Sequence, residues 1–501
     1  MKKSIAKLFI SVSGLIVIDK ILGFIRQMIV ASSFGATMET DIINLSQSAV
    51  TDIQYILAQT LITSFVSIYI YLQSEEHESE NRSKFFAGDS IKVFIAISFL
   101  LTCLLYVSST LISKILAPSY SEKFSFELAK HIRIYSVLIV LFALICIFRA
   151  ILSANKNFIP EQLISFNQSV ITIGIVLIIG NNYGPKILII AFFCYTFWNT
   201  FFLGFLCRKH IRFGLDSPWK NVEVKQLFRT MGPLLLSHSL IYVNQMVDRM
   251  LVSGLEAGTI TSLIYGATLS NLITAFITAF CSMIFSYITS EISKHNYVIA
   301  SNIANTSTKI LMIIFMPVTI TFITCAYDIV SIIYGYGVFD NNAVLSASFA
   351  LKGYAVMFVP MVIREIFSRF QYAFKDTKRP MINGSIGIIG NVIFSIIFCN
   401  FLGVSGVALA TSLSILISAV LNMISAKKKT SFLSFLQLKR FFVRFFLISV
   451  CAVIIMMCVY DNMLEINKLL RIIIVFAGCM LFYGIAFGKE IVIILKNMKN
   501  H

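Results

Sequence analysis

The sequence lacks the motifs of soluble nucleotide-binding and metal-dependent enzymes. It has no GxxxxGK[ST] loop to hold phosphates, no HExxH pair of metal ligands and no nucleophile elbow. Its six histidines are scattered along the 501 residues and form no cluster. These absences argue against a hydrolase or a metalloenzyme, and they leave the chain without a P-loop for nucleotide.

Charge is also scarce in this chain. Only 13% of the residues are charged and 57% are apolar, with a mean hydropathy of +0.85, far from the balance of a soluble domain. Apolar stretches near the ~20 residues that cross a bilayer recur along the chain, for example at 91–113, 187–207 and 469–487. The pattern predicts an all-α integral membrane protein with about 14 transmembrane helices.

Cysteine pairs and a cleavage site are missing as well. The ten cysteines lie in or beside apolar stretches, with no CxxC, which indicates packing residues rather than disulfides or a metal knuckle. The basic start of the chain imitates a secretory signal, but the apolar run continues through Asp19, Lys20 and Arg26 without a small-residue cleavage site. We therefore predict a retained first helix.

Lysine and arginine are distributed unevenly among the predicted loops. They crowd segments 208–229 and 427–444 and are absent from 32–41, 254–262, 335–344 and 399–406. The positive-inside rule therefore predicts a protein of the bacterial inner membrane with both termini on the cytoplasmic side. The net charge of +17 then reports orientation and not a nucleic-acid partner. One loop breaks the pattern, at Lys114, Lys123 and Lys130.

The sequence also contains an internal repeat. Three ordered matches recur at offsets of 223, 220 and 219 residues: Arg26 and Gly35 with Arg249 and Gly258, Arg149 and Pro160 with Arg369 and Pro380, and 184–191 with 403–410. An even number of helices separates the copies, which predicts a parallel repeat with a pseudo-two-fold axis along the membrane normal. We therefore expect two six-helix lobes and two further helices near 441–460 and 469–487. The predicted divisions are 1–207 (first lobe), 208–229 (basic cytoplasmic linker), 230–427 (second lobe) and 428–501 (last two helices and cytoplasmic tail).

Ionisable residues inside the apolar stretches are the candidates for a site, because a charge in lipid is costly and must face protein or water. Arg26 and Arg249 hold equivalent places in the repeat, and we expect their guanidinium groups to face each other across the lobe interface. Such a pair suits a pyrophosphate or another polyanion. The alternative is structural, with Arg26 paired to Asp19 or Asp52 and Arg249 paired to Asp248.

Other charged residues in predicted helices leave the same alternatives open. Lys20 and Arg364 could contact an anionic ligand or stabilise the helices. For Arg369, Lys375, Lys378 and Arg379, at a predicted cytoplasmic helix end, orientation and headgroup contact are the favoured roles.

Five stretches resemble the lipid II (murein precursor) flippase family of the multidrug/oligosaccharidyl-lipid/polysaccharide exporter superfamily. They are KILGFIRQMIVASSFGATMETD at 20–41, VDRMLVSGLEAGTITSLIYGATL at 247–269, YGYGVFD at 334–340, YAFKDTKRP at 372–380 and GVSGVALATSLS at 403–414. The resemblance implies two helical lobes, a lipid-facing groove at the last two helices, and alternating access around a cationic cavity. Its substrate class is a polyprenyl-pyrophosphate-linked saccharide, as used in peptidoglycan biosynthesis and the control of cell shape.

The family's site residues carry over incompletely. Arg26 and Asp41 match family positions, and Lys20 replaces a family Arg. Together with Arg249 and Arg364 they form the predicted substrate-binding set. Family charges are replaced by Gln27, Gln54, Gln59-Thr60-Leu61 and Ala267-Thr268. The replacements favour a divergent member that carries lipid II or a surface-polysaccharide repeat unit.

Energy for transport must come from an ion gradient or the membrane potential, since the chain has no nucleotide site. Asp248, Asn391, Thr411 and the Val407 carbonyl offer hard oxygen ligands to a monovalent cation, Na⁺ or H⁺, as in the sodium site of some family members. Ser395 stands where such a site would want a second carboxylate. A helix–helix hydrogen-bond network explains the same residues equally well.

These observations predict a flippase that moves the lipid-linked saccharide from the inner to the outer leaflet, as a monomer and without another cofactor. Its expected partners are membrane lipids and glycosyltransferases of the same pathway. Three rivals remain: a cation-coupled multidrug exporter, which would want an anionic cavity; a membrane-bound polymerase or glycosyltransferase, which would want a long outside loop; and a transport-dead scaffold.

Overall fold

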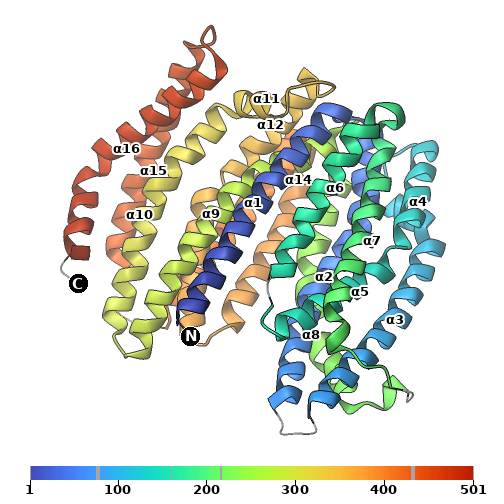
Figure 1. The fold of residues 1–501 in the computed structure, drawn as a ribbon. Coiled ribbons are helices and arrows are strands. Elements are labelled where there is room, and N and C mark those ends of the chain that lie inside the picture. Colours follow the sequence, from blue (N-terminus) through green and yellow to red (C-terminus); the bar gives the residue numbers. More distant parts are fainter. Residues whose placement is uncertain (1, 75–78, 158, 215–216, 430–434, 500–501) are drawn as a thin grey trace. The chain divides into compact units, whose positions relative to one another are not determined.

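The protein is helical throughout the part that the structure describes. The computed structural model describes residues 2–74, 79–157, 159–214, 217–429 and 435–499, so parts of both basic segments fall outside it. Within these ranges every regular element is a helix (Figure 1). The α-helices are α1 (Lys2–Phe34), α2 (Met38–Ser74), α3 (Ser79–Leu116), α4 (Glu122–Ser136), α5 (Ile139–Ala154), α6 (Ile159–Tyr183), α7 (Ile187–Cys207), α8 (Val222–Val252), α9 (Thr259–Ser293), α10 (Tyr297–Thr324), α11 (Ala326–Tyr334), α12 (Asn341–Ala355), α13 (Phe358–Ala373), α14 (Lys378–Lys427), α15 (Phe435–Asp461) and α16 (Lys468–Lys499). Short 3₁₀ turns are η1 (Gly184–Lys186), η2 (Arg208–His210) and η3 (Pro218–Lys220).

The number of spans agrees with the prediction. In the described ranges, ten segments are long and apolar enough to cross a membrane, and the bent pair α4 and α5 adds an eleventh. α14 kinks at Gly403, where φ is 57° and ψ is −133°, so its 50 residues form two arms. The more highly charged helices α1 and α8 are 33 and 31 residues long. With these two helices and the second arm of α14 counted as spans, the total reaches the 14 predicted.

The helices divide into two compact units. The first comprises 1–260 together with 337–339, and the second comprises 261–336 and 340–501. α8, which the sequence repeat assigns to the second lobe, packs in the first unit against α2 and α3. Aromatic rings join these helices, since Tyr55 and Tyr242 stack with centroids 6.1 Å apart.

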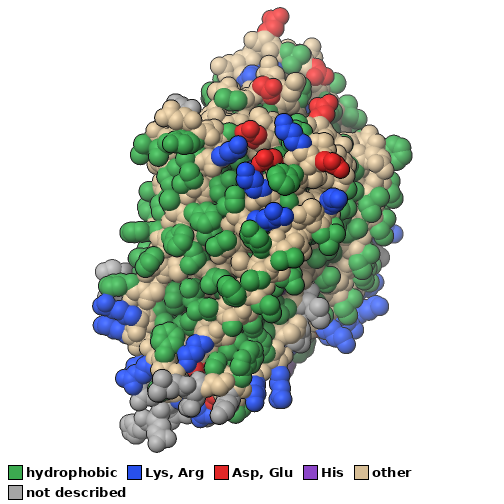
Figure 2. Space-filling model, turned by 90° about the vertical axis from the view of Figure 1, so that its right-hand side faces the viewer, with side chains coloured by type: hydrophobic (Ala, Val, Ile, Leu, Met, Phe, Trp, Pro, Cys, Tyr) green, Lys and Arg blue, Asp and Glu red, His purple; other side chains and the backbone are tan. Residues whose placement is uncertain are grey.

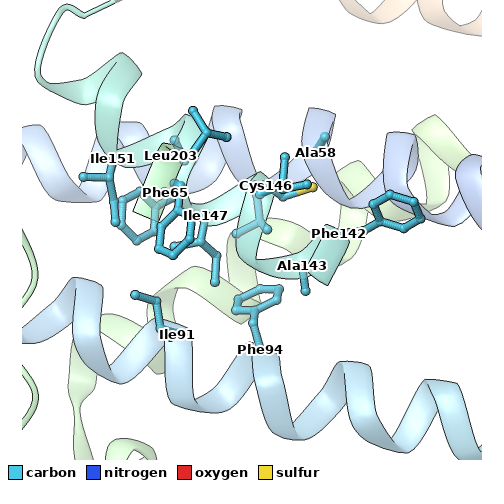
Figure 3. Close-up of a cluster of buried hydrophobic side chains, with 14 of the residues drawn as sticks. Ala58, Phe65, Ile91, Phe94, Phe142, Ala143, Cys146, Ile147, Ile151 and Leu203 are labelled. Atoms are coloured by element: carbon cyan, nitrogen blue, oxygen red, sulfur yellow. The ribbon is translucent and has the colours of Figure 1, made fainter. Parts of the chain in front are cut away.

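A dense apolar core holds the first unit together. Ala58 and Phe65 of α2, Ile91 and Phe94 of α3, several residues of α5 and Leu203 of α7 meet in one cluster (Figure 3). The rings of Phe65 and Phe86 stack at 4.9 Å. Apart from Arg149 and Ser153, α5 consists of apolar residues, as expected of a helix enclosed by others. No disulfide joins the cysteines that the structure describes, and six of the ten are buried.

The second unit relies on close approach of small residues. A Cβ added to Gly353 of α12 would lie 2.6 Å from the Ala408 Cβ and 2.7 Å from the Ser405 carbonyl oxygen, both on α14. The Ser412 hydroxyl donates to the Gly353 carbonyl at 2.6 Å. Packing through small residues and hydroxyls is typical of membrane helices, where lipid provides no hydrophobic drive for association.

We predict that Gly353→Ala separates α12 from α14 and destabilises the protein by about 1–3 kcal/mol, the usual cost of overpacking. A lower midpoint of thermal unfolding in detergent would measure this effect. The matched control is Gly384→Ala on α14, where an added Cβ meets nothing within 4 Å. The control should leave the midpoint unchanged or raise it, because Ala favours a helix over Gly. Equal midpoints for the two variants would contradict the packing argument.

The backbone repeats the duplication seen in the sequence. Three pairs of left-handed residues are separated by 219 or 223 positions: Lys156 and Lys375 (φ 59° and 60°), Gly184 and Gly403 (62° and 57°), and Gly35 and Gly258 (64° and 85°). A lysine rarely adopts positive φ, so the matched lysines show that equivalent helices end in the same turn. The helix pairs α4 with α5 and α12 with α13 are both broken in the middle. These features confirm a duplicated helical fold.

Within the second unit, a buried ion pair attaches the last two helices to α11. α15 and α16 pack against α10 and against each other. Arg471 of α16 donates to the Asp328 carboxylate of α11 at 3.0 Å, and these side chains are 7% and 0% exposed. Lys468 donates to the Ser331 hydroxyl at 2.6 Å. The bounds of α15 and α16 enclose the two predicted stretches.

Candidate functional site

Arg26 carries a guanidinium on the long helix α1 that forms no ion pair in the described part of the chain. It lies on α1, about 12 Å from the end of that helix, and its side chain is partly buried. α1 packs along α6, where Gly23 approaches Ser169. Arg26 interacts electrostatically with Asp19 and with the phenol of Tyr195 on α7, yet it forms a salt bridge with neither. The predicted pairing of Arg26 with Asp19 or Asp52 is therefore not observed.

Lys20 and Asp19 share the same helix but differ in exposure. Lys20 is exposed, whereas Asp19 is buried, with its Oδ1 atom unpartnered among the described residues. The Asp19 carboxylate interacts electrostatically with both Lys20 and Arg26. Two positive side chains thus accompany one carboxylate on this part of α1, which keeps an excess of positive charge.

Arg249 is compensated, in contrast to Arg26. Its Nη1 donates to the Asp52 carboxylate of α2 at 2.7 Å, and both side chains are mostly buried. Its Nη2 donates to Gln245 at 3.5 Å, one turn earlier on α8. The structure therefore shows the structural alternative for Arg249, with Asp52 and not Asp248 as the salt-bridge partner. A ligand at Arg249 would have to compete with Asp52.

Asp41 ties a turn to the start of α2. It is buried, and its Oδ2 accepts a hydrogen bond from the Gly258 backbone N–H at 2.7 Å. Gly258 has a φ of +85°, and a Cβ there would collide with the backbone carbonyl of Ala36. This geometry suits a structural role for Asp41, because its carboxylate stabilises the α8–α9 turn that closes on the α1–α2 turn.

Arg364 belongs to a cluster in which two guanidinium groups share one carboxylate. Its Nη2 donates to Glu365 at 3.0 Å, and Arg369 donates to the other oxygen of Glu365 at 3.1 Å. Arg369 also donates to the Ser282 hydroxyl of α9 at 2.8 Å. With two guanidinium groups and one carboxylate, the cluster has one net positive charge on α13. Arg369 is part of this cluster and also lies near the end of α13, as the sequence predicts.

Three of the four predicted cation ligands meet between the arms of α14. Asn391 donates to the Thr411 hydroxyl at 3.0 Å, and Thr411 donates to the Val407 carbonyl at 3.3 Å. Ser395 donates to the Asn391 side-chain oxygen at 3.0 Å. This is the hydrogen-bond network weighed as the alternative to a cation site. The fourth residue, Asp248, is buried on α8 in the first unit.

The YAFKDTKRP stretch forms the turn between α13 and α14. Asp376 accepts from Lys429 Nζ at 2.8 Å and from the Arg379 backbone N–H at 3.2 Å. The Lys429 hydrogen bond is the main reason that the pKa of Asp376 is held below its ordinary value. The turn is thus tied to the far end of α14.

This pKa direction predicts a small dependence of stability on pH. A carboxyl whose pKa is lower in the folded state than in the unfolded state contributes stability above the unfolded value, about 3.9. The contribution is lost as pH falls through the folded value. We expect Asp376→Asn to lower the unfolding midpoint slightly at pH 7, and the difference from wild type to shrink below about pH 4. A difference of constant size down to pH 3 would contradict this account.

Two cavities lie apart from the predicted residues. One, of about 450 Å³, lies between the ends of α1 and α6 and includes Thr37 and Glu39. The other, of about 370 Å³, lies where the Arg82–Glu223 ion pair joins α3 to α8. Sequence reasoning also missed Arg471 with Asp328. The signal was present, since Arg471 is an ionisable residue within an apolar stretch.

An all-helical membrane protein with a duplicated backbone and uncompensated charge inside its helices has the features of a secondary transporter. A family model described as lipid II flippase MurJ matches residues 30–477. The chain belongs to the lipid II flippase family. It is a transporter, not an enzyme, and a multi-pass membrane protein.

Relatives match over most of their length. The probable lipid II flippase MurJ of Rickettsia prowazekii (strain Madrid E) is 25% identical over 407 residues, 79% of each chain. The probable lipid II flippase MurJ of Buchnera aphidicola subsp. Acyrthosiphon pisum is 22% identical and covers 94% of each chain. The resemblance noted in the sequence is therefore confirmed.

Solved structures show the same fold. A structure titled lipid II flippase MurJ, inward closed conformation, aligns with a TM-score of 0.80 at 22% identity, covering 96% of this chain and 100% of that one. An inward-facing multidrug resistance MATE family transporter of the MOP superfamily aligns with a TM-score of 0.67 at 14% identity, covering 83% and 95%.

Proposed function

We propose that the protein flips a polyprenyl-pyrophosphate-linked saccharide, lipid II or a related repeat unit, between membrane leaflets. The observation that carries the proposal is Arg26. A charged guanidinium without an ion pair is costly inside a membrane, so its retention in a transporter calls for an anionic ligand. A pyrophosphate supplies that charge, and family membership supports the saccharide carrier.

The other predicted residues take different parts in this proposal. Lys20 lies on the same helix as Arg26 and would add charge near the headgroup. Arg364, with Glu365 and Arg369, would offer its one net charge from α13. Arg249 would bind only if Asp52 released it, and Asp41 would act by keeping the Gly258 turn in place.

The orientation follows from the distribution of lysine and arginine. The basic segments 208–229 and 427–444 would lie on the cytoplasmic side of a bacterial inner membrane, together with both termini. Transport from the inner to the outer leaflet would then deliver the saccharide outside. Glycosyltransferases that supply or use the same lipid are the expected partners of a monomeric flippase.

The test is a flipping assay in proteoliposomes with purified protein and fluorescent lipid-linked saccharides. We expect faster transfer of pyrophosphate-linked lipids than in protein-free vesicles, and no acceleration of the same glycolipid without its pyrophosphate. Running lipid II beside an O-antigen-type repeat unit identifies the cargo. Equal acceleration of the uncharged glycolipid would refute the role of the anion.

Coupling to a monovalent cation or to the membrane potential is part of the same proposal. Hydrogen bonds join the Asn391 amide, the Thr411 hydroxyl and the Val407 carbonyl, and Asp248 is the candidate carboxylate. Replacing Na⁺ by N-methylglucamine, and separately collapsing the proton gradient or the potential, distinguishes the sources. If flipping responds to Na⁺ in the wild type and equally in Asn391→Ala, this group is not the coupling site.

A further inference from the structure

Three basic residues lie on the packed helices α3 and α4, at a place that the positive-inside rule does not explain. Lys114, Lys130 and Arg133 lie at the end of the first unit where the positive-inside rule expects few. α3 and α4 pack together, and in the described ranges none of these three residues makes an ion pair. Figure 2 shows this side of the molecule, with hydrophobic side chains over its middle, a mixed group of basic and acidic side chains in its upper part and further basic side chains at its lower end.

Arg133 is held in a fixed orientation by neutral groups. Its Nε donates to the Ser109 hydroxyl at 2.7 Å, and its Nη2 donates to the Thr110 hydroxyl at 3.1 Å. The guanidinium also lies 5.7 Å from the ring centre of Tyr106. Ser109 gives its own proton to the Tyr106 carbonyl at 2.9 Å, so its oxygen can only accept from Arg133.

These contacts leave one edge of the guanidinium available. The side bearing Nε and Nη2 is occupied by the two hydroxyl groups, whereas the Nη1–Nη2 edge has no partner among the described residues. Hydroxyl groups do not cancel the positive charge. A planar donor pair with full charge matches two oxygens of a phosphate.

The surroundings favour a lipid over a soluble phosphate. Ser109 and Thr110 lie about 10 Å from the end of α3, close to the depth of lipid headgroups. Apolar side chains on the same face are open to the bilayer, with Val107 81% and Leu111 63% exposed. Lys114 lies near the end of α3, and Lys130 lies about one turn before Arg133 on α4. Both would hold a second phosphate oxygen, while Glu122 and Glu127 are the acidic residues of α4.

We propose that Arg133, oriented by Ser109 and Thr110 and assisted by Lys114 and Lys130, binds the phosphate of an anionic phospholipid. The acyl chains would lie along Val107 and the exposed part of α3. The site is separate from the transport residues on α1. Its placement in the outer leaflet rests on the proposed orientation, whereas its existence does not.

Native mass spectrometry of the full chain in detergent tests the site. The probes are phosphatidylglycerol, phosphatidylcholine with the same acyl chains, and inorganic phosphate. We expect Arg133→Gln to weaken the first phosphatidylglycerol binding step about tenfold, the loss of one charge-assisted contact. Arg133→Lys should weaken it by at least threefold because an ammonium cannot form the fork. The matched control is Lys294→Gln, which removes one charge from an exposed lysine paired with Glu291.

Each outcome decides the proposal. Weaker phosphatidylglycerol binding in the Arg133 variants, with unchanged phosphatidylcholine binding and an unchanged control, supports it. Ser109→Ala keeps the charge and should lower binding about threefold, which covers the case that Arg133→Gln fails to fold. Unchanged binding in all Arg133 and Ser109 variants overturns the proposal, as does displacement of the lipid by inorganic phosphate at equal concentration.

Discussion

Replacing Arg26 by alanine is expected to slow flipping of a pyrophosphate-linked saccharide by about 10- to 100-fold. A hydrogen bond to a charged group contributes about 1.5–3 kcal/mol, and every 1.4 kcal/mol is a factor of ten. Arg26 has no ion pair among the described residues, so no protein carboxylate competes with the ligand for its guanidinium. The rate of appearance of labelled lipid in the opposite leaflet measures the effect.

Two further variants make the Arg26 experiment specific. Arg26→Lys keeps the charge but loses the planar pair of donors, and it should recover only part of the rate. Arg379→Ala removes an exposed guanidinium from the first turn of α14 and should leave the rate unchanged. If all three variants flip like the wild type, the pyrophosphate does not bind at Arg26.

Breaking the Arg471–Asp328 pair is expected to destabilise the attachment of α16 by about 3–5 kcal/mol. Both side chains are almost fully buried, so Asp328→Ala leaves a charge without a partner, and so does Arg471→Met. The double variant Asp328→Leu with Arg471→Met should recover much of the loss, because an apolar pair needs no desolvation of charge. Unfolding midpoints in detergent measure all three.

A native cysteine, Cys479, can show whether the loss of stability occurs at the contact between α10 and α16. Cys479 is buried on α16 and contacts Thr321 of α10. Its labelling by maleimide, mapped by peptide mass, should increase in each single variant and fall again in the double variant. Unchanged labelling with a lowered midpoint would place the damage outside the α10–α16 contact.

Much of the fold could be predicted from the sequence because it depends on length, hydropathy and repeat spacing. The offset that relates Gly35 to Gly258 reappears in the backbone, where both residues have positive φ. The packing of α8 on α2 could not be predicted in this way. That contact depends on the Asp52–Arg249 pair and the stacked Tyr55 and Tyr242 rings, which leave no periodic signal in one sequence.

The site was less predictable than the fold because one sequence shows charges but not their partners. Asp248 is next to Arg249 along the chain, yet successive residues on a helix point in different directions, and the salt-bridge partner comes from α2. Asn391 and Thr411 lie close together, since the kink at Gly403 folds the two arms of α14 together. Whether they hold a cation stays a prediction.

The matched left-handed residues show how the two halves of the chain have diverged. Turn geometry is shared between them, while the pairing of the equivalent arginines is not. The Arg249 guanidinium joins α8 to α2 through its salt bridge with Asp52. Its counterpart, Arg26, has no salt bridge among the described residues. Because one arginine joins two helices and the other does not, equivalent substitutions at the two positions are expected to have different effects, on stability at Arg249 and on transport at Arg26.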